Sequence, residues 1–219
     1  MDNLRLKFSK TGRAVYISHL DLMRTMQRAF LRSGLQLKYS EGFNPHAQIS
    51  FALPLSVGAS SYCELMDFKL NDFMSFSEIP FRLNKALPEG ITVIDVYEGE
   101  NKFKNIKWLD IDGVFEYDSR DVTEILPELM SFYSQDSIVI KKKTKSGIGD
   151  SDIAPAIRSI TFDSSGNYIK LKAIVSAQEP TLNPELLTSA LEQLAPQLAP
   201  DFSAYTRTQI YDSEMNVFK

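Results

Sequence analysis

The chain has 219 residues, of which 43% are hydrophobic and 24% charged, a composition typical of one large or two small globular domains. Its single cysteine, Cys63, excludes an internal disulfide and any cysteine-based zinc or iron–sulfur site. The N-terminus is charged from position 2 onward, and no apolar run approaches the ~18 residues of a membrane span. We therefore expect a cytoplasmic protein without signal peptide or transmembrane helix.

The net charge of −4 conceals a basic N-terminal segment. Residues 1–48 carry eight Lys and Arg against three acids, whereas residues 49–100 carry three against eight. A local positive surface attracts a phosphate backbone within a Debye length even when the whole protein is acidic. The distribution is compatible with RNA binding, although most surfaces of this kind are simply solvated.

The first half of the chain alternates strand and helix patterns. Apolar residues alternate from Leu4 to Phe8, and an amphipathic helix begins after Ser18 and ends at Gly34. The later predicted elements are an apolar stretch at 49–57, a strand at 62–70, a helix from about 75 to 87 and a strand at 91–97. This β-α-β-β-α-β order is typical of a ferredoxin-like fold.

A polar linker at 101–107 precedes a second round of the same order. The predicted elements are strands at 109–117 and from 138, a helix at 123–133, a hairpin of 160–162 with 168–175, a helix after 183–184 and a strand at 205–211, with 141–159 irregular. We expect an α+β protein of two tandem ferredoxin-like domains, residues 1–100 and 108–219.

Short motifs are concentrated in the predicted N-terminal domain. They are residues 16–24 (YISHLDLMR), 32–35 (RSGL), 39–46 (YSEGFNPH) and 49–55 (ISFALPL), with Gly58 and Glu64. Together they resemble the bacterial radical-SAM-linked protein family. In the second domain the positions similar to the family are Asp152, Ile153, Pro155, Ile157 and Leu182 to Pro184, while Ser151 stands where a basic residue is often found. The resemblance implies a radical S-adenosylmethionine protein as partner and no established activity.

The chain itself is not the radical enzyme, because one cysteine cannot supply the C-x3-C-x2-C ligands of such a cluster. A phosphate-binding loop is also absent from the sequence, since the glycines at Gly147 and Gly149 lack the G-x4-G-K-[ST] spacing. We expect the chain to hold no cofactor and no metal.

The two histidines are the weak catalytic candidates. His19 lies in the first turn of a predicted helix, and His46 follows Asn44 and Pro45 in a loop. With Asp21 or Glu41 they have the chemistry for acid–base catalysis or a metal site, but they meet only if the loop 36–48 runs back across the sheet. The ordinary alternative is that His19 caps or packs its helix and His46 fixes the loop.

Two basic clusters are candidates for phosphate contact. Arg24, Arg28 and Arg32 share one helix face, either to grip successive phosphates or as the usual charged face of an amphipathic helix. The second cluster is Lys141, Lys142, Lys143 and Lys145, which on an edge strand commonly guards against aggregation.

The loop from Glu41 to His46 has the composition of a shaped recognition element. Gly42 permits a positive φ, Pro45 fixes the backbone and Phe43 offers an aromatic anchor. We expect a non-catalytic accessory protein that binds or presents the substrate of a radical S-adenosylmethionine enzyme, with RNA the preferred substrate. The alternatives are a metal-independent RNA-processing endonuclease using His19 or His46, and a protein-docking module. The expected binding surface comprises His19, Arg24, Arg28, Arg32, Tyr39, Glu41, Gly42, Phe43, Asn44, Pro45 and His46.

Overall fold

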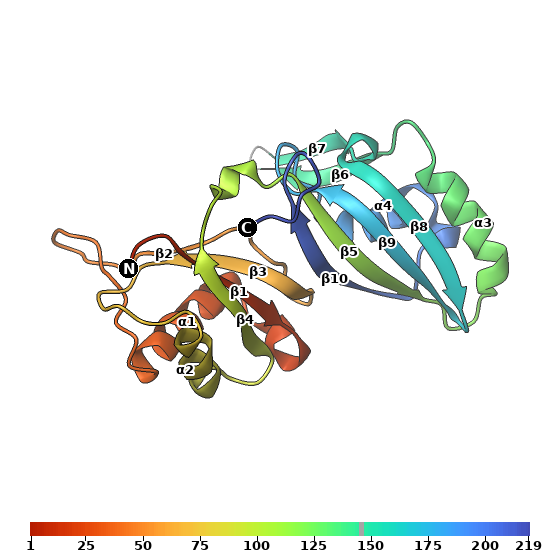
Figure 1. Cartoon of the computed structure of the whole chain (residues 1–219). Helices are drawn as coiled ribbons and strands as arrows, with labels where there is room; N and C mark the ends of the chain where they lie inside the picture. The colour runs from red at the N-terminus through yellow and green to blue at the C-terminus, as the bar shows by residue number, and fades with distance from the viewer. Residues whose placement is uncertain (145–146) are drawn as a thin grey trace. The chain divides into compact units, whose positions relative to one another are not determined.

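The computed structural model describes residues 1–144 and 147–219, which form two compact units, residues 1–103 with Lys219 and residues 104–218 (Figure 1). Each unit combines helices with an antiparallel sheet, so the α+β prediction is confirmed. None of the helices in the described residues has the length and apolarity needed to cross a membrane.

The first unit follows the predicted order of elements. They are β1 (Leu4–Lys10), a 3-10 turn η1 (Gly12–Tyr16), α1 (His19–Arg32), β2 (Ile49–Phe51), β3 (Ser60–Phe68), α2 (Glu78–Ala86) and β4 (Ile91–Glu98), followed by a short turn η2 (Phe103–Asn105). The strands lie in the order β4-β1-β3-β2, and every pair is antiparallel.

Alternation along β1 separates a core face from an open face. Leu4 and Leu6 pair with Phe68 and Met66 and are completely buried in the core beneath the helices. Arg5, between them, points to the opposite face and pairs with Asp67. Ser18 caps α1 as predicted, and Gly34 after its end has φ +72°, a conformation that glycine adopts at little cost.

The strand β2 covers only the beginning of the apolar stretch at 49–57. Pairing with β3 continues as far as the Ala52 amide, which donates to the Leu65 carbonyl at 3.0 Å. Pro54 has no amide hydrogen to continue the ladder. The rest of the stretch is therefore a loop.

The second unit has the same relative strand order with an insertion. Its elements are β5 (Trp108–Glu116), α3 (Val122–Tyr133), β6 (Val139–Thr144), β7 (Gly147–Asp152), η3 (Ala154–Ala156), β8 (Ile157–Ser165), β9 (Tyr168–Ser176), α4 (Glu185–Leu194), η4 (Pro196–Leu198) and β10 (Phe202–Tyr211). The four-stranded order is β10-β5-β9-β8, again fully antiparallel. As in the first unit, the strand after the second helix flanks the first strand.

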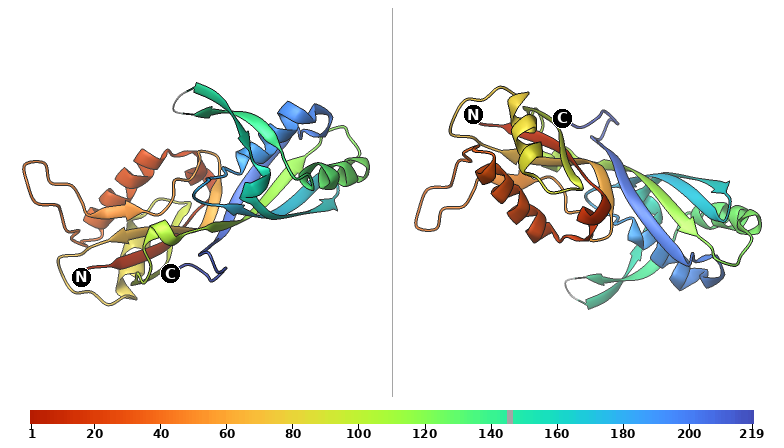
Figure 2. Two further views of the ribbon diagram at one scale, coloured as in Figure 1. Left: turned by 90° about the horizontal axis from the view of Figure 1, so that it is seen from above. Right: turned by 90° about the horizontal axis from the view of Figure 1, so that it is seen from below.

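The prediction that residues 141–159 are irregular is wrong. Strands β6 and β7 pair with each other and with no other described strand, and β8 begins at Ile157 (Figure 2). The sequence of β7, GIGDSD, has no apolar alternation, and the strand is paired with β6 through its backbone. Lys145 of the predicted lysine cluster lies outside the described residues.

Candidate functional site

Hydrogen bonds among the side chains of Ser18, Asp21 and Arg24 form the start of α1. The Ser18 hydroxyl accepts from the Asp21 amide at 3.2 Å and donates to Asp21 Oδ2 at 2.7 Å. Arg24 donates to the other oxygen, Oδ1, at 3.2 Å. The hydrogen bond from Ser18 is the main cause that lowers the pKa of Asp21. These contacts define where the helix begins and engage Arg24 locally.

His19, the first residue of α1, packs rather than projecting into a cleft. Its ring lies edge-on to the Phe51 ring of β2, with centroids 5.3 Å apart and an interplanar angle of 77°. Phe51 points to the face of β2 that meets the core. His19 thus joins the helix start to the edge strand.

His46 belongs to a different environment, at the base of an exposed hairpin. Its Nδ1 lies 2.8 Å from the Ser40 hydroxyl, and its amide donates to the same oxygen at 3.1 Å. The Ser40 amide donates to the His46 carbonyl at 2.9 Å. His46 therefore orders the loop, as the ordinary alternative predicted.

The structure does not bring the two histidines together. The His19 ring lies against Phe51, which faces the core, whereas His46 lies with Ser50 and Asp67 on the open side of the sheet. Within the described residues no group of three or more His, Cys, Asp or Glu side chains is placed to hold a metal ion. The loop 36–48 does not run back across the sheet to meet His19.

The loop instead forms what we call the motif hairpin, residues 38–48. The Gln48 amide donates to the Lys38 carbonyl at 2.8 Å, and Tyr39 forms an antiparallel bridge with Ala47. Gly42 has φ +115° in the turn, a value that a side chain would strain. Phe43, at the tip, is fully exposed. Figures 1 and 2 show this hairpin protruding beyond the end of α1.

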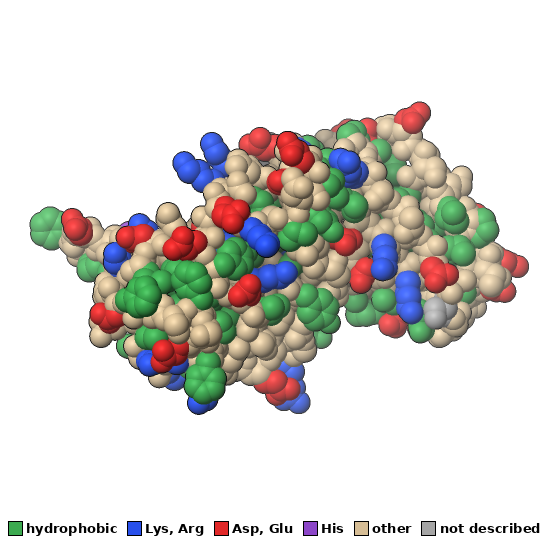
Figure 3. Space-filling model, in the orientation of Figure 1, with side chains coloured by type: hydrophobic (Ala, Val, Ile, Leu, Met, Phe, Trp, Pro, Cys, Tyr) green, Lys and Arg blue, Asp and Glu red, His purple; other side chains and the backbone are tan. Residues whose placement is uncertain are grey.

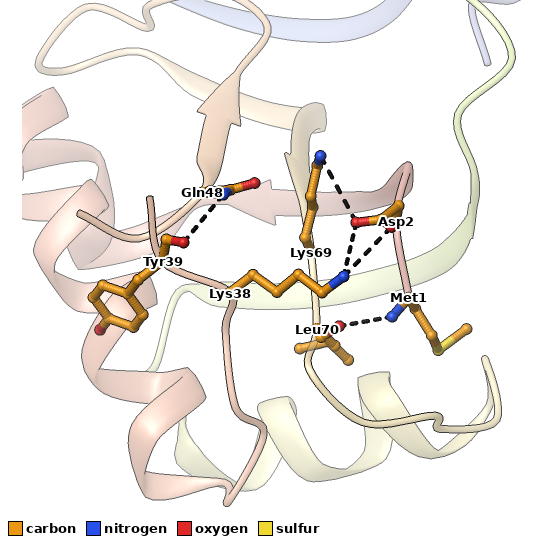
Figure 4. A network of polar contacts seen from close by, with 7 residues as sticks. All are labelled: Met1, Asp2, Lys38, Tyr39, Gln48, Lys69 and Leu70. Atoms are coloured by element: carbon orange, nitrogen blue, oxygen red, sulfur yellow. Dashed lines mark hydrogen bonds and ion pairs between the residues drawn. The ribbon is translucent and has the colours of Figure 1, made fainter. Parts of the chain in front are cut away.

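A polar network ties the base of the motif hairpin to the N-terminal strand (Figure 4). Lys38 Nζ lies 3.2 Å from Asp2 Oδ1, and Lys69 Nζ lies 3.7 Å from the same oxygen. The hydrogen bond from Lys38 is the main cause that lowers the pKa of Asp2. The Gln48 amide side chain donates to the Tyr39 carbonyl at 3.1 Å. The hairpin base is therefore fixed while its tip is open.

The arginine row on α1 is divided by the fold. Arg32 donates to the carbonyl of Ala86 at 2.6 Å, at the end of α2 where carbonyls lack helical partners. Arg24 contacts Asp21, whereas Arg28 is exposed and forms no side-chain hydrogen bond with a described residue. Arg24 and Arg28 are thus the row's accessible cations, and Arg32 joins the two helices.

Sequence reasoning missed a pocket of about 490 Å³ on the open side of the first unit. His46 and Lys69 line it together with the segment 99–102 after β4. Its floor is Arg5, which is buried and donates to both oxygens of Asp67 at 2.7 and 2.9 Å. Alternation along residues 4–8 indicated that Arg5 faces away from the core, but no local signal indicated that the later segment covers it.

The segment after β4 closes over Arg5 through several contacts. The guanidinium donates to the Asn101 carbonyl at 2.8 Å and lies 4.3 Å from the centre of the Phe103 ring. Burial raises the pKa of nearby Tyr97 to about 12. The pocket rim carries Lys69, Lys102 and His46, which are donors suited to an anionic ligand, beside Asp67 and Glu100.

Residues 3–184 match the sequence model of a family described as "Uncharacterized protein conserved in bacteria (DUF2344)". No curated protein has a matching sequence. Among solved structures, the chain is similar to one in the "Crystal Structure of a Cbf5-Nop10-Gar1 Complex", with a TM-score of 0.55 and 9% identity over 95% of this chain and 49% of that one. It therefore spans about half the length of that chain, and the likeness concerns the fold alone.

A second similar structure is that of an unknown protein from Galdieria sulphuraria, with a TM-score of 0.27 and 9% identity over 94% of this chain and 98% of that one. This likeness carries no argument about fold or function. The family match, by contrast, extends from β1 to the residue before α4. Because it covers most of the residues, the chain belongs to this uncharacterised family of bacterial proteins.

Proposed function

We propose that the chain is a non-catalytic accessory protein that binds RNA for a radical S-adenosylmethionine enzyme. The observation that carries this proposal is the motif hairpin, whose backbone is fixed by paired hydrogen bonds while Phe43 is fully exposed at its tip. An exposed aromatic ring at the tip of a hairpin with a fixed base is a platform for an unpaired base, and such stacking contributes about 1–3 kcal/mol per base. The end of the protruding segment, at the left of Figure 3, carries hydrophobic and acidic side chains.

Cations near the hairpin supply the contacts that a phosphate backbone needs. Lys69, Lys102 and His46 line the pocket at the hairpin base. Arg24 and Arg28 are exposed on α1, which ends beside the hairpin (Figure 1). Phosphate contacts of this kind position a strand without reading its sequence. The proposed interface therefore combines base stacking with backbone attraction.

We also assign both units to the ferredoxin-like fold. The support is the β-α-β-β-α-β order of each unit and the matching order of strands in each sheet, with β6 and β7 inserted in the second. An RNA-recognition motif shares this order of elements but reads bases on its open sheet face. In the first unit, part of that face is covered by the segment that closes over Arg5. The protruding hairpin is thus the better place for base contacts.

The proposal of a radical S-adenosylmethionine partner is supported by the motif resemblance. The proposal of a non-catalytic role is supported by the positions of the two histidines. An endonuclease reading requires His19 or His46 beside a scissile phosphate with a second acid–base group in reach. His19 packs on Phe51 and His46 bonds to Ser40, on opposite faces. The contacts of both residues therefore favour binding over catalysis.

RNA binding is tested by fluorescence anisotropy with a labelled single-stranded RNA of mixed sequence. Phe43→Ala is expected to weaken binding by about fivefold or more through lost stacking. Phe81→Ala is the matched control, because Phe81 is also an exposed phenylalanine but lies on α2. Arg24→Glu/Arg28→Glu spares the structural Arg32 and removes two phosphate contacts. At ~0.7 per contact, the slope of log Kd against log salt concentration should fall by about 1.4. Absence of binding by the unaltered protein overturns the proposal.

The partner is tested by recovering the tagged chain from its host and sequencing co-purifying proteins by mass spectrometry. We expect to recover a protein with a C-x3-C-x2-C cluster motif. The same protein should co-purify with the Arg24→Glu/Arg28→Glu variant. Recovery of such a partner without any RNA affinity favours the protein-docking alternative, for which exposed aromatic side chains are also typical. Recovery of no such protein contradicts the accessory role.

A further inference from the structure

Each unit carries a hairpin at the same position in its order of secondary-structure elements, after the first helix and before the next strand of the sheet. In the first unit the motif hairpin lies between α1 and β2, the edge strand of the sheet. In the second unit the β6–β7 ribbon, described over residues 139–144 and 147–152, lies between α3 and β8, which is also the edge strand. The second hairpin is thus the topological counterpart of the first.

The base of the β6–β7 ribbon is fixed to its own unit. The Gln193 side chain of α4 accepts from the Lys141 amide at 2.8 Å and donates to the Lys141 carbonyl at 3.1 Å. Asp152 Oδ1 accepts from the amides of Ile138 and Ala154 at 2.9 and 3.0 Å. Ile140 is buried. The ribbon is therefore anchored where it leaves the unit, as the motif hairpin is.

The outer part of the ribbon carries positive charge without opposing carboxylates. Across the pair of strands, Lys142 lies opposite Gly149 and Lys143 lies opposite Ile148, whereas Lys141 lies opposite Asp150. Among the described residues no carboxylate lies within 4.0 Å of the ammonium group of Lys142 or Lys143. Ile148 is 80% exposed on the same face as Lys143, whereas Lys142, the preceding residue of the strand, points to the other face of the ribbon. This combination of cations and an exposed apolar side chain suits the backbone and base of a nucleic acid.

Protection of a free strand edge is the competing explanation for the lysines. Both strands of the ribbon have one edge that pairs with no other described strand. The charges of β7, Asp150 and Asp152, lie in its inner half, while its outer half is Gly147, Ile148 and Gly149. Edge protection would need charge on the outer half of both strands, and only β6 carries it there, which favours ligand binding.

We propose that the β6–β7 ribbon is a second RNA contact of this chain, in which Lys143 binds a backbone phosphate on the face where Ile148 lies against a base or sugar, and Lys142 binds a phosphate from the opposite face. This inference rests on the proposed RNA-binding function of the chain. It adds a contact that recognises the phosphate backbone and not the sequence, because ammonium groups on a flexible stem act as point charges.

The test compares two pairs of lysines in the same RNA-binding assay at about 50 and 200 mM salt. Lys142→Gln/Lys143→Gln removes the ribbon charges. Lys170→Gln/Lys172→Gln is the matched control, since it removes equal charge from exposed positions on β9 that pair with Asp163 and Asp112. We expect the ribbon variant to bind several-fold more weakly at low salt, with a salt dependence lower by about 1.4, and the control to stay within about twofold.

The outcomes separate this inference from the proposed function. If Phe43→Ala weakens binding but the ribbon variant binds as the unaltered protein does, the ribbon contact is wrong and the motif hairpin stands. An equal loss in the ribbon variant and the control also overturns the ribbon contact, because only overall charge then matters. If the ribbon variant alone loses affinity while Phe43→Ala does not, the ribbon contact holds and the stacking role of the motif hairpin fails. Circular dichroism of each variant checks that the fold is retained.

Discussion

Replacing Gly90 by alanine should destabilise the first unit through a backbone collision. Gly90 has φ +88° in the turn between α2 and β4, and a Cβ there would lie 2.4 Å from the Thr11 carbonyl oxygen and 2.9 Å from Ala14 Cβ. The positive φ costs a non-glycine residue about 1–2 kcal/mol, and the forced shift of neighbouring atoms adds about 1–3 kcal/mol. The shift also strains the hydrogen bond from the Thr11 amide to the Gly90 carbonyl, now 2.7 Å. We expect a total loss of about 2–5 kcal/mol.

Native-state hydrogen exchange of the slowest amides in β1 and β4 measures this loss in the full chain. Gly58→Ala is the control, since Gly58 has φ +95° but nothing within 4 Å of its built Cβ. The control should lose only the conformational part, about 1–2 kcal/mol. The difference between the variants isolates the collision with Thr11. Equal losses in the two variants would refute the reasoning.

Three further expectations follow from the contacts described. Burial raises the pKa of Tyr117 to about 12 from its ordinary 10, so the protonated phenol contributes fully to the free energy of unfolding below pH 10. This contribution, up to about 3 kcal/mol, is lost as the pH rises to about 12. Urea unfolding at several alkaline pH values should show a smaller fall of the unfolding free energy with pH in Tyr117→Phe, and an unchanged fall would contradict this. His46→Ala should speed amide exchange in the motif hairpin by loss of the Ser40 contact while β1 amides exchange as before, and faster exchange throughout the unit would count against a local role. Leu129→Ala empties a fully buried site in α3 and should lower the unfolding free energy of the second unit by about 3–5 kcal/mol, followed by the fluorescence of Trp108 in urea; a loss below about 1 kcal/mol would mean that the site collapses around the smaller side chain.

Local patterns predicted the helices and the faces of the strands well. The Ser18 cap and the glycine at position 34 set the limits of α1, and alternation along residues 4–8 placed Arg5 away from the core. These features depend on neighbours in sequence, where capping chemistry and side-chain period act directly.

Features that depend on distant residues could not be predicted. The pocket exists because the segment after β4 folds over Arg5, with Asn101 lying 96 residues away in sequence, and Arg32 is engaged by a carbonyl of another helix. The partition of the two histidines to opposite faces follows from the register of β2 against β3, which no single-sequence pattern specifies. The ribbon was missed because the pairing of β7 uses backbone groups and leaves no periodic signature.

The ribbon's separate pairing also bears on how proteins of this design can diversify. The four strands of the second unit form their antiparallel order without β6 or β7. Lengthening, shortening or recharging the ribbon beyond its anchor at Gln193 therefore leaves the core side chains of that unit in place. Substitutions in the ribbon, natural or engineered, can therefore change what the chain binds while the four-stranded sheet of the second unit keeps its stability.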